Sequence, residues 1–229
     1  MRFGLFGKLQ SKRDFIAIGT PRAFLSVWEP WIQASMASSR LLLAEGWRDA
    51  FLTSPIWRFW LGADLCGATV SGALMPSMDG VGRYFPLAVL AMAEEGEAQP
   101  PPELDDAAGW HDRLEEFLVG TLESAAAFEA TIAGLAALPL PPSARTEAPT
   151  SGSLGIAGRV DEDFPDFFAR SRIAGSRDAY AGMTFWWTTG GRDYPPAALA
   201  VRGMPDPVRY AAMLTGRFVE PGPGMDDDR

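Results

Sequence analysis

The stretch IWRFWLGADLCGATVSGALMPSMDGVGRYFPLAVLAMA, residues 56–93, decides the fold. It holds three apolar runs, at residues 56–62, 65–75 and 84–93, which are rich in β-branched and aromatic side chains and are typical of strands. Because the connections between the runs are short, neighbouring strands are predicted to be antiparallel. The loop between the second and third strands therefore lies at one end of a sheet.

Further strands are predicted near both ends of the chain. RFGLFGKL at residues 2–9 is typical of a short opening strand, and GMTFWWTTG at 182–190 and AALAVRG at 197–203 are typical of two late strands. Helices are predicted before, between and after these strands. One mixed sheet with helices on both faces accounts for this order more simply than two domains, so we expect a single α/β domain.

The helical segments are predicted to be interrupted at two places. A helix begins after Thr20-Pro21 and should break or kink at Pro30, with a second helix starting at Ser38 or Ser39. Residues 104–135 follow an amphipathic helical pattern that would be about 48 Å long as one helix, so we expect a break near Gly120 or the run Ala125–Ala127.

The expected domain spans residues 1–219. Within it, the segment 139–155, PLPPSARTEAPTSGSLG, has the composition of a linker or loop. The last segment, residues 220–229, is expected to be a disordered polar tail.

Composition excludes several classes of protein. A net charge of −9 with no basic stripe argues against a nucleic-acid partner, because phosphate binding depends on clustered cations. The most apolar stretch contains Asp64 and several glycines, so insertion into a membrane is not expected. His111 is the only histidine and Cys66 the only cysteine, so we expect no intrachain disulfide and no metal site built on histidine or a cysteine cluster. Binding of magnesium or calcium by carboxylates alone stays open, although neither an EF-hand spacing nor a repeated D-x-D run occurs outside the tail. We take no metal and no cofactor as the expectation. A cytoplasmic location is expected, and the oligomeric state stays open.

The loop MPSMDGVGRYFPL, residues 75–87, places Ser77, Asp79 and Arg83 together between apolar strands. Ser77 lacks the strand-to-helix setting of a nucleophile elbow. Serine at the first position and glycine at the fourth suit a type I turn, which an ion pair between Asp79 and Arg83 would close. A hairpin turn, a catalytic site and a binding surface all remain open.

Other chemically interesting side chains are predicted to lie in the core. His111 falls on the apolar stripe of its helix, which indicates a histidine at the edge of the core. Trp186 and Trp187 are adjacent in a predicted strand and must point to opposite faces of the sheet, so either both faces are covered there or one ring is exposed for binding.

Four sequence elements together resemble one known family. They are G-L-F-G-K-L at residues 4–9, D-F at 14–15, S-P-x-W-R-F at 54–59 and G-x-x-M-P-S-x-D-x-x-G-R-x-F-P at 72–86. This set resembles the TagF family, also called ImpM, whose members are accessory proteins of bacterial type VI secretion. The chain departs from the family pattern in having glutamine at position 10, usually proline, and arginine at position 13, usually glycine.

The resemblance implies a cytoplasmic, non-enzymatic regulator with a three-layer α/β/α fold. Such a protein represses assembly of the secretion apparatus after translation, by contact with its forkhead-associated (Fha) protein. The motif positions are occupied by a polar cluster of four residues, Lys8, Ser77, Asp79 and Arg83. As residues that could support this cluster we take those in or near the other motifs and the late tryptophan pair: Asp14, Trp57, Arg58, Trp186 and Trp187.

Two other functions are retained as alternatives. The first is an enzyme or a small-ligand-binding protein that uses Lys8, Ser77, Asp79 and Arg83 as a polar site. It requires the opening strand to lie beside the second and third strands, so that Lys8 reaches Asp79. The second is a structural subunit of a larger assembly, which would be retained stoichiometrically in that assembly.

Overall fold

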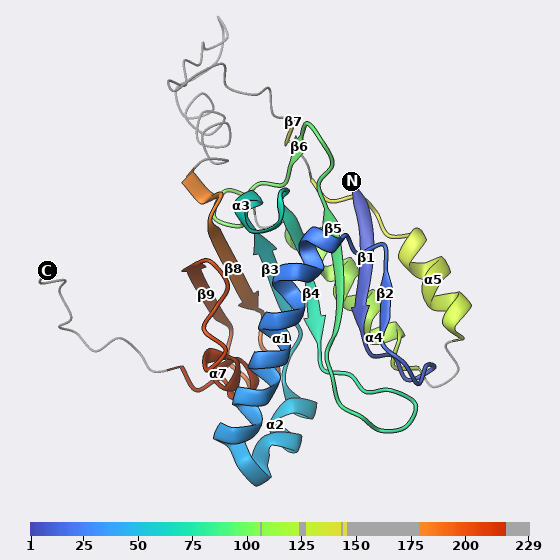
Figure 1. Ribbon diagram of the computed structural model, residues 1–229, viewed down its shortest axis with the longest axis vertical. Helices are drawn as coiled ribbons and strands as arrows, with labels where there is room; N and C mark the ends of the chain where they lie inside the picture. The colour runs from blue at the N-terminus through green and yellow to red at the C-terminus, as the bar shows by residue number, and fades with distance from the viewer. Residues whose placement is uncertain (106, 124–126, 143, 146–178, 219–229) are drawn as a thin grey trace, which may run out of the picture.

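The computed structural model describes residues 1–105, 107–123, 127–142, 144–145 and 179–218. A seven-stranded sheet with the order β2-β1-β5-β4-β3-β8-β9 lies at its centre (Figure 1). Its strands are β1 (Arg2–Gly7), β2 (Ile16–Ile18), β3 (Trp57–Leu61), β4 (Val70–Met75), β5 (Leu87–Met92), β8 (Met183–Thr188) and β9 (Ala197–Arg202). A separate pair is formed by β6 (Glu97–Ala98) and β7 (Ala144–Arg145).

The described neighbours in the large sheet are antiparallel throughout, so the prediction of a mixed sheet is wrong. The physical reason is that β1–β2, β3–β4, β4–β5 and β8–β9 are each consecutive in the chain and joined without a long crossover. The pairs β1–β5 and β3–β8, which are distant in sequence, meet in the same antiparallel sense. The predicted antiparallel order of the three central strands is confirmed, except that Ala63–Cys66 forms a short helix, α3, before β4 begins.

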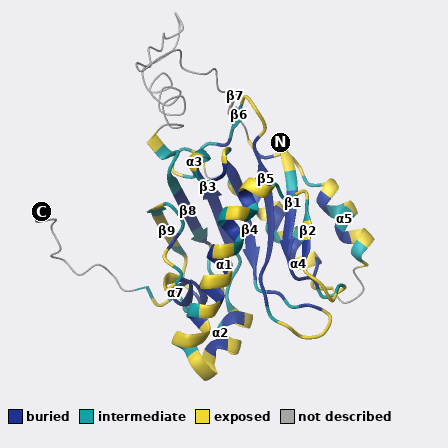
Figure 2. Cartoon of the chain, viewed as in Figure 1, coloured by how far each residue is buried: buried dark blue, intermediate teal, exposed yellow. Residues whose placement is uncertain are grey.

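Side chains of the central strands alternate between two core clusters. Along β5, Ala88 and Leu90 belong to a cluster shared with α1 (Arg22–Leu43), α2 (Trp47–Thr53) and α7 (Arg209–Thr215). Leu87 and Val89 belong to a second cluster, shared with α4 (Ala108–Gly120) and α5 (Phe128–Ala136). Every residue of β4 and β5 is therefore buried, as the dark blue strands of Figure 2 show.

The long helix α1 runs without interruption through Pro30, so the predicted break and the second start at Ser38 or Ser39 are wrong. An internal proline costs a helix about 3 kcal/mol. Burial of Trp28 and Trp31 on either side of Pro30 offsets that cost, because each large apolar side chain contributes about 1.5–3 kcal/mol when fully buried. A turn of 3₁₀ helix, Ala44–Gly46, then leads into α2.

The predicted break near Gly120 is confirmed, since α4 ends at that residue and α5 begins at Phe128. Of the predicted linker, residues 139–142 and 144–145 are described, and 146–155 lie outside the described residues. The predicted tail at 220–229 also lies outside them. In the part of the chain that the structure covers, no helix has the length and apolar character needed to cross a membrane.

Candidate functional site

The loop between β4 and β5, residues 76–86, is called the motif loop below. It lies against a second loop, residues 8–15, which leaves the end of β1. The two loops are neighbours because β1 pairs with β5 in a register that sets Gly7 opposite Leu87. Gly7 has a φ of 134°, and a Cβ atom there would lie 2.0 Å from the carbonyl oxygen of Pro86. Glycine at this position therefore permits the close approach that brings Lys8 to the motif loop.

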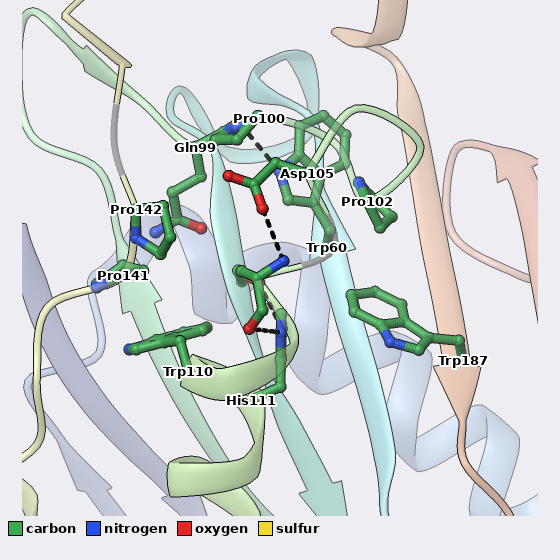
Figure 3. A pocket seen from close by; sticks show the side chains of 12 residues that line it. Trp60, Gln99, Pro100, Pro102, Asp105, Trp110, His111, Pro141, Pro142 and Trp187 are labelled. Carbon is green, nitrogen blue, oxygen red and sulfur yellow. Dashed lines mark hydrogen bonds between the residues drawn. The ribbon is translucent and has the colours of Figure 1, made fainter.

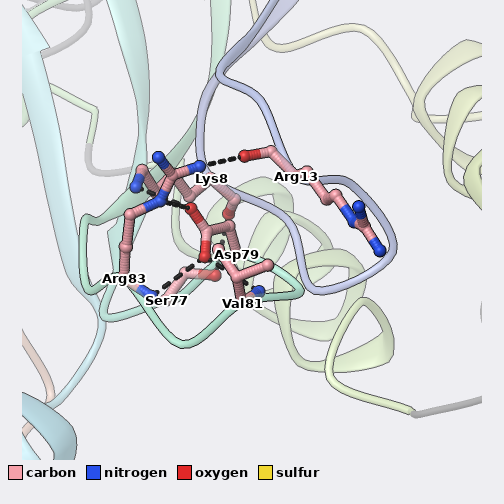
Figure 4. Close-up of polar contacts among 6 residues, drawn as sticks. All are labelled: Lys8, Arg13, Ser77, Asp79, Val81 and Arg83. Atoms are coloured by element: carbon pink, nitrogen blue, oxygen red, sulfur yellow. Dashed lines mark hydrogen bonds and ion pairs between the residues drawn. The ribbon is translucent and has the colours of Figure 1, made fainter.

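Asp79 is the centre of the site, and its carboxylate is 1% exposed. The Lys8 ammonium donates to Oδ2 at 2.7 Å, and the Arg83 Nε donates to the same oxygen at 2.6 Å. The backbone N–H groups of Val81 and Arg83 donate to Oδ1 at 3.1 and 2.9 Å (Figure 4). Four donors thus converge on one carboxylate, close to the number of hydrogen bonds that its two oxygens can accept.

These contacts keep Asp79 ionised. Burial acts to raise the pKa of the carboxyl, but hydrogen bonds from Lys8, from Arg83 and from the Val81 backbone outweigh it, so the pKa lies well below its usual range. A carboxylate held in this state does not readily accept a proton near neutral pH. Asp79 is therefore poorly suited to serve as a general base.

Ser77 connects the two loops from inside. It is 5% exposed, and its Oγ donates to the backbone carbonyl of Lys8 at 2.8 Å. The motif loop is closed on itself by Phe85 N–H to Ser77 carbonyl at 3.0 Å and Asp79 N–H to Arg83 carbonyl at 3.1 Å. Ser77 therefore holds the motif loop to the residue that follows β1.

Apart from the Lys8 side chain, the loop at residues 8–15 bonds to the motif loop through backbone groups. The Lys12 carbonyl accepts from the Gly80 N–H at 2.9 Å, and the Arg13 carbonyl accepts from the Arg83 guanidinium. A Cβ atom at Gly80 would lie 2.8 Å from the Gln10 carbonyl, so the two loops are in close contact there. Both departures from the family pattern, Gln10 and Arg13, thus face the motif loop through backbone carbonyls that any residue supplies.

The four residues of the predicted polar cluster are brought together, but they differ in exposure. Lys8, Ser77 and Asp79 are buried, whereas the Arg83 side chain is 60% exposed. Around it, Phe15 is 52% exposed and Val81 is 55% exposed. The cluster therefore has a buried polar interior and an outer surface with one guanidinium and two apolar side chains.

The predicted supporting residues are not part of this cluster. Asp14 lies beside it in the 8–15 loop but is exposed. Trp57 and Arg58 are in β3, which β4 and β5 separate from β1. The Trp57 indole donates to the Met213 carbonyl at 3.0 Å. The Arg58 guanidinium pairs with two acids of α4, Asp112 and Glu115, each at 2.6 Å.

The tryptophan pair in β8 points to opposite faces, as predicted. Trp186 is fully buried against Trp28 and Trp31 of α1. Trp187 is half-buried, and its ring centroid lies 4.8 Å from that of His111 on the other face. Both are therefore distant from the motif loop in the order of the sheet.

A second polar group was not predicted from the sequence. His111 is buried, with its Nε2 3.0 Å from the Ser71 hydroxyl and its Nδ1 3.2 Å from the Ala107 carbonyl. With Trp60, Trp110, Trp187 and the Gln99 amide it lines a cavity of about 10 Å³ (Figure 3). Such a volume holds about one water molecule and no organic substrate. The placement of His111 at the core, predicted from its helical stripe, is confirmed.

Within the described ranges, no three His, Cys, Asp or Glu side chains lie close enough together to coordinate a metal ion. The absence of a cofactor stays a prediction.

Comparison with known proteins defines the class. A family model described as the TagF N-terminal domain, type VI secretion system-associated, matches residues 4–138. The crystal structure of PA0076 from Pseudomonas aeruginosa PAO1 has a TM-score of 0.78 and 32% sequence identity, covering 98% of this chain and 100% of that chain. No curated protein matches. The chain is thus an α/β protein associated with type VI secretion. It belongs to the TagF family.

Proposed function

We propose that this chain is a cytoplasmic, post-translational negative regulator of type VI secretion that acts by binding another protein, the forkhead-associated component of the apparatus. The observation that carries the proposal is the match of residues 4–138 to the TagF N-terminal domain. The family resemblance supplies the direction of the effect and the partner.

The geometry of the polar cluster favours binding over catalysis. Asp79 accepts four hydrogen bonds, and Ser77 donates its only hydroxyl proton to the Lys8 carbonyl. The Lys8 ammonium is buried against Asp79 at 2.7 Å. A nucleophile needs a free proton acceptor beside it, and a general base needs a pKa near neutrality. The alternative of an enzyme built on these residues meets the requirement that Lys8 reach Asp79, but it lacks such a base at the cluster.

The proposal divides the cluster into two parts. Lys8, Ser77 and Asp79 hold the two loops together and fix the backbone. The exposed side chains around them, Arg83, Val81 and Phe15, form the surface that a partner contacts. Arginine and aromatic side chains are enriched at the centres of protein interfaces, which supports this assignment.

The test uses two variants with the same chemical change. Val81 in the motif loop is 55% exposed and Val119 on α4 is 52% exposed. Tagged wild-type chain, Val81→Ser and Val119→Ser are each used to recover partners from the native cytoplasm, after circular dichroism and thermal melting show that all three are folded. Partners are identified by mass spectrometry.

We expect the wild type and Val119→Ser to recover the forkhead-associated protein, and Val81→Ser to recover several-fold less. Equal recovery by all three would exclude the motif loop as the interface. Recovery of no forkhead-associated protein by the wild type would overturn the proposed partner. Stoichiometric recovery of the assembled apparatus would instead favour a structural subunit.

The proposal also includes the arrangement of helices on the two faces of the sheet. We propose that the chain is a three-layer α/β/α sandwich, as the family resemblance implies. Support comes from the alternation of β5 side chains between a cluster shared with α1 and a cluster shared with α4. A crystal structure of this chain with helices on one face of the sheet alone would overturn it.

A further inference from the structure

A groove of about 490 Å³ lies between α1 and the motif loop. One wall is a stripe of α1 side chains at positions i, i+3, i+4 and i+7, and the other comes from the two loops of the polar cluster. The lining residues are Gln33, Met36, Ala37 and Arg40 from α1, and Lys8, Phe15, Gly82, Arg83, Tyr84 and Phe85 from the loops. Met36 and Phe85 are buried and form an apolar floor, whereas Arg40 and Arg83 are exposed.

The groove is basic although the chain carries a net charge of −9. The Arg40 guanidinium, in the groove lining, lies 4.5 Å from the centroid of the Trp47 ring. The Arg48 guanidinium is outside the lining and lies 5.8 Å from the ring centroid of Tyr84, which is a lining residue. In the described ranges, neither Arg40 nor Arg48 has a carboxylate within 4.0 Å. Lys8 and Arg83 share one carboxylate, that of Asp79, so this pair retains a net positive charge.

The two arginines of the groove are held in place before any partner binds. The Arg40 guanidinium stacks on an aromatic ring, which restricts its motion while leaving its N–H donors available. Arg83 is held by Asp79 and by the Arg13 carbonyl. Two guanidinium groups fixed in advance lose little entropy when they bind carboxylates. The exposed ring of Phe15 beside them offers an apolar contact.

We infer that this groove binds an acidic segment of a partner protein, with carboxylates of the segment on Arg40 and Arg83 and an apolar side chain between Phe15 and Met36. The inference rests on the proposed function, because it takes the partner to be a protein. Charge complementarity selects the occupant: the groove places Arg40, which has no ion-pair partner among the described residues, beside Lys8 and Arg83, which share the single carboxylate of Asp79. Such a groove attracts an anionic segment and repels a basic one. The volume suits a few side chains, in the range of ordinary ligand sites.

The test measures binding of a short fluorescein-labelled peptide of alternating glutamate and phenylalanine by fluorescence anisotropy. The variants are Arg40→Glu and, as a matched control on the same helix, Arg22→Glu. Both arginines are exposed, and their positions on α1 differ by 18 residues, about 27 Å along the helix axis. Arg40→Gln serves as a milder second variant, and circular dichroism shows that each protein is folded.

We expect the wild type and Arg22→Glu to bind alike, with affinity falling as salt is added, and Arg40→Glu to bind at least about tenfold more weakly. Arg40→Gln should lie between them. A peptide with lysine in place of glutamate should not bind. Absence of binding to the wild type, equal binding by Arg40→Glu, or displacement by inorganic phosphate as effective as by unlabelled peptide would each overturn the inference.

Failure here is distinguishable from failure of the proposed function. If the peptide does not bind but the wild type recovers the forkhead-associated protein from cytoplasm, the groove inference is wrong and the function stands. If the peptide binds with the expected dependence on Arg40 but no such protein is recovered, the groove stands and the partner assignment is wrong.

Discussion

Substitution of Ser77 by alanine tests whether the two loops of the site are held together from inside. The hydroxyl of Ser77 is 5% exposed and donates to the Lys8 carbonyl at 2.8 Å. Its removal leaves that carbonyl without this donor in a buried place. An unsatisfied buried acceptor costs about 1–3 kcal/mol, so the free energy of unfolding should fall by that amount.

The measurement is urea unfolding followed by tryptophan fluorescence, together with thermal melting. For a chain of this length, about 1 kcal/mol lowers the melting temperature by about 2–4 °C, so the expected shift is about 2–12 °C. Ser26→Ala on α1 is the control, because its hydroxyl donates to the Ala23 carbonyl at 2.8 Å from an exposed position. Its effect should stay within about 0.5 kcal/mol.

The outcome that would refute this reasoning is a Ser77→Ala protein as stable as Ser26→Ala. Ser77 would then be dispensable for the contact between the loops, and the polar cluster would need another explanation. A loss of stability without loss of partner recovery at permissive temperature is the result expected of a residue that braces the loops.

Three further perturbations follow from the structure. Gly7→Ala should lower the free energy of unfolding by more than about 2 kcal/mol, because its Cβ would lie 2.0 Å from the Pro86 carbonyl oxygen. Gly46→Ala is the control: nothing lies within 4 Å of a Cβ at that position, so this change should be neutral or stabilising by up to about 1 kcal/mol. Equal effects of the two substitutions on thermal melting would contradict this reasoning. The partners of Asp79 lower its pKa, so its contribution to stability is present above the unfolded pKa of about 3.9 and is lost as pH falls below that value. Urea unfolding over this pH range should show a smaller loss of stability in acid for Asp79→Asn than for the wild type. An identical pH profile for the two proteins would argue against this assignment. Burial raises the pKa of the Cys66 thiol to about 11, so iodoacetamide should label it at mildly alkaline pH only as fast as the protein opens, and labelling as rapid as that of a free thiol would contradict this.

The central strands were predictable from the sequence because their signal is local. Residues 56–93 alternate or run apolar over strand lengths and are separated by short turns, and β3, β4 and β5 follow that order. The strand β2 was not predicted, since Ile16–Ile18 is too short for a period to be read and exists through its pairing with β1. The continuous helix α1 was also missed, because local rules penalise Pro30 and do not include the tertiary burial that offsets it.

The candidate site was predictable only in part. Asp79 and Arg83 are four residues apart, so their ion pair could be proposed from the sequence. The contact of Lys8 with Asp79 joins residues 71 positions apart and depends on the pairing of β1 with β5. Likewise, Ser71 and His111 meet across 40 positions, and the groove arises where α1 passes the motif loop. Such contacts cannot be predicted from the spacing of residues within one segment.

The buried residues of the motif and the exposed side chains around them have different physical roles. Lys8, Ser77 and Asp79 are buried; Lys8 donates to Asp79, and Ser77 donates to the Lys8 carbonyl. The geometry of the two loops therefore restricts which residues can stand at these positions. A buried carboxylate with two cations and two backbone donors allows few substitutions, because each would leave a charge or an N–H group unpaired. Phe15 and Arg40 are not part of that buried network of hydrogen bonds, and both line the groove. Under the proposed function, specificity for the partner would be set at these exposed positions, while the polar cluster keeps the backbone of the site the same.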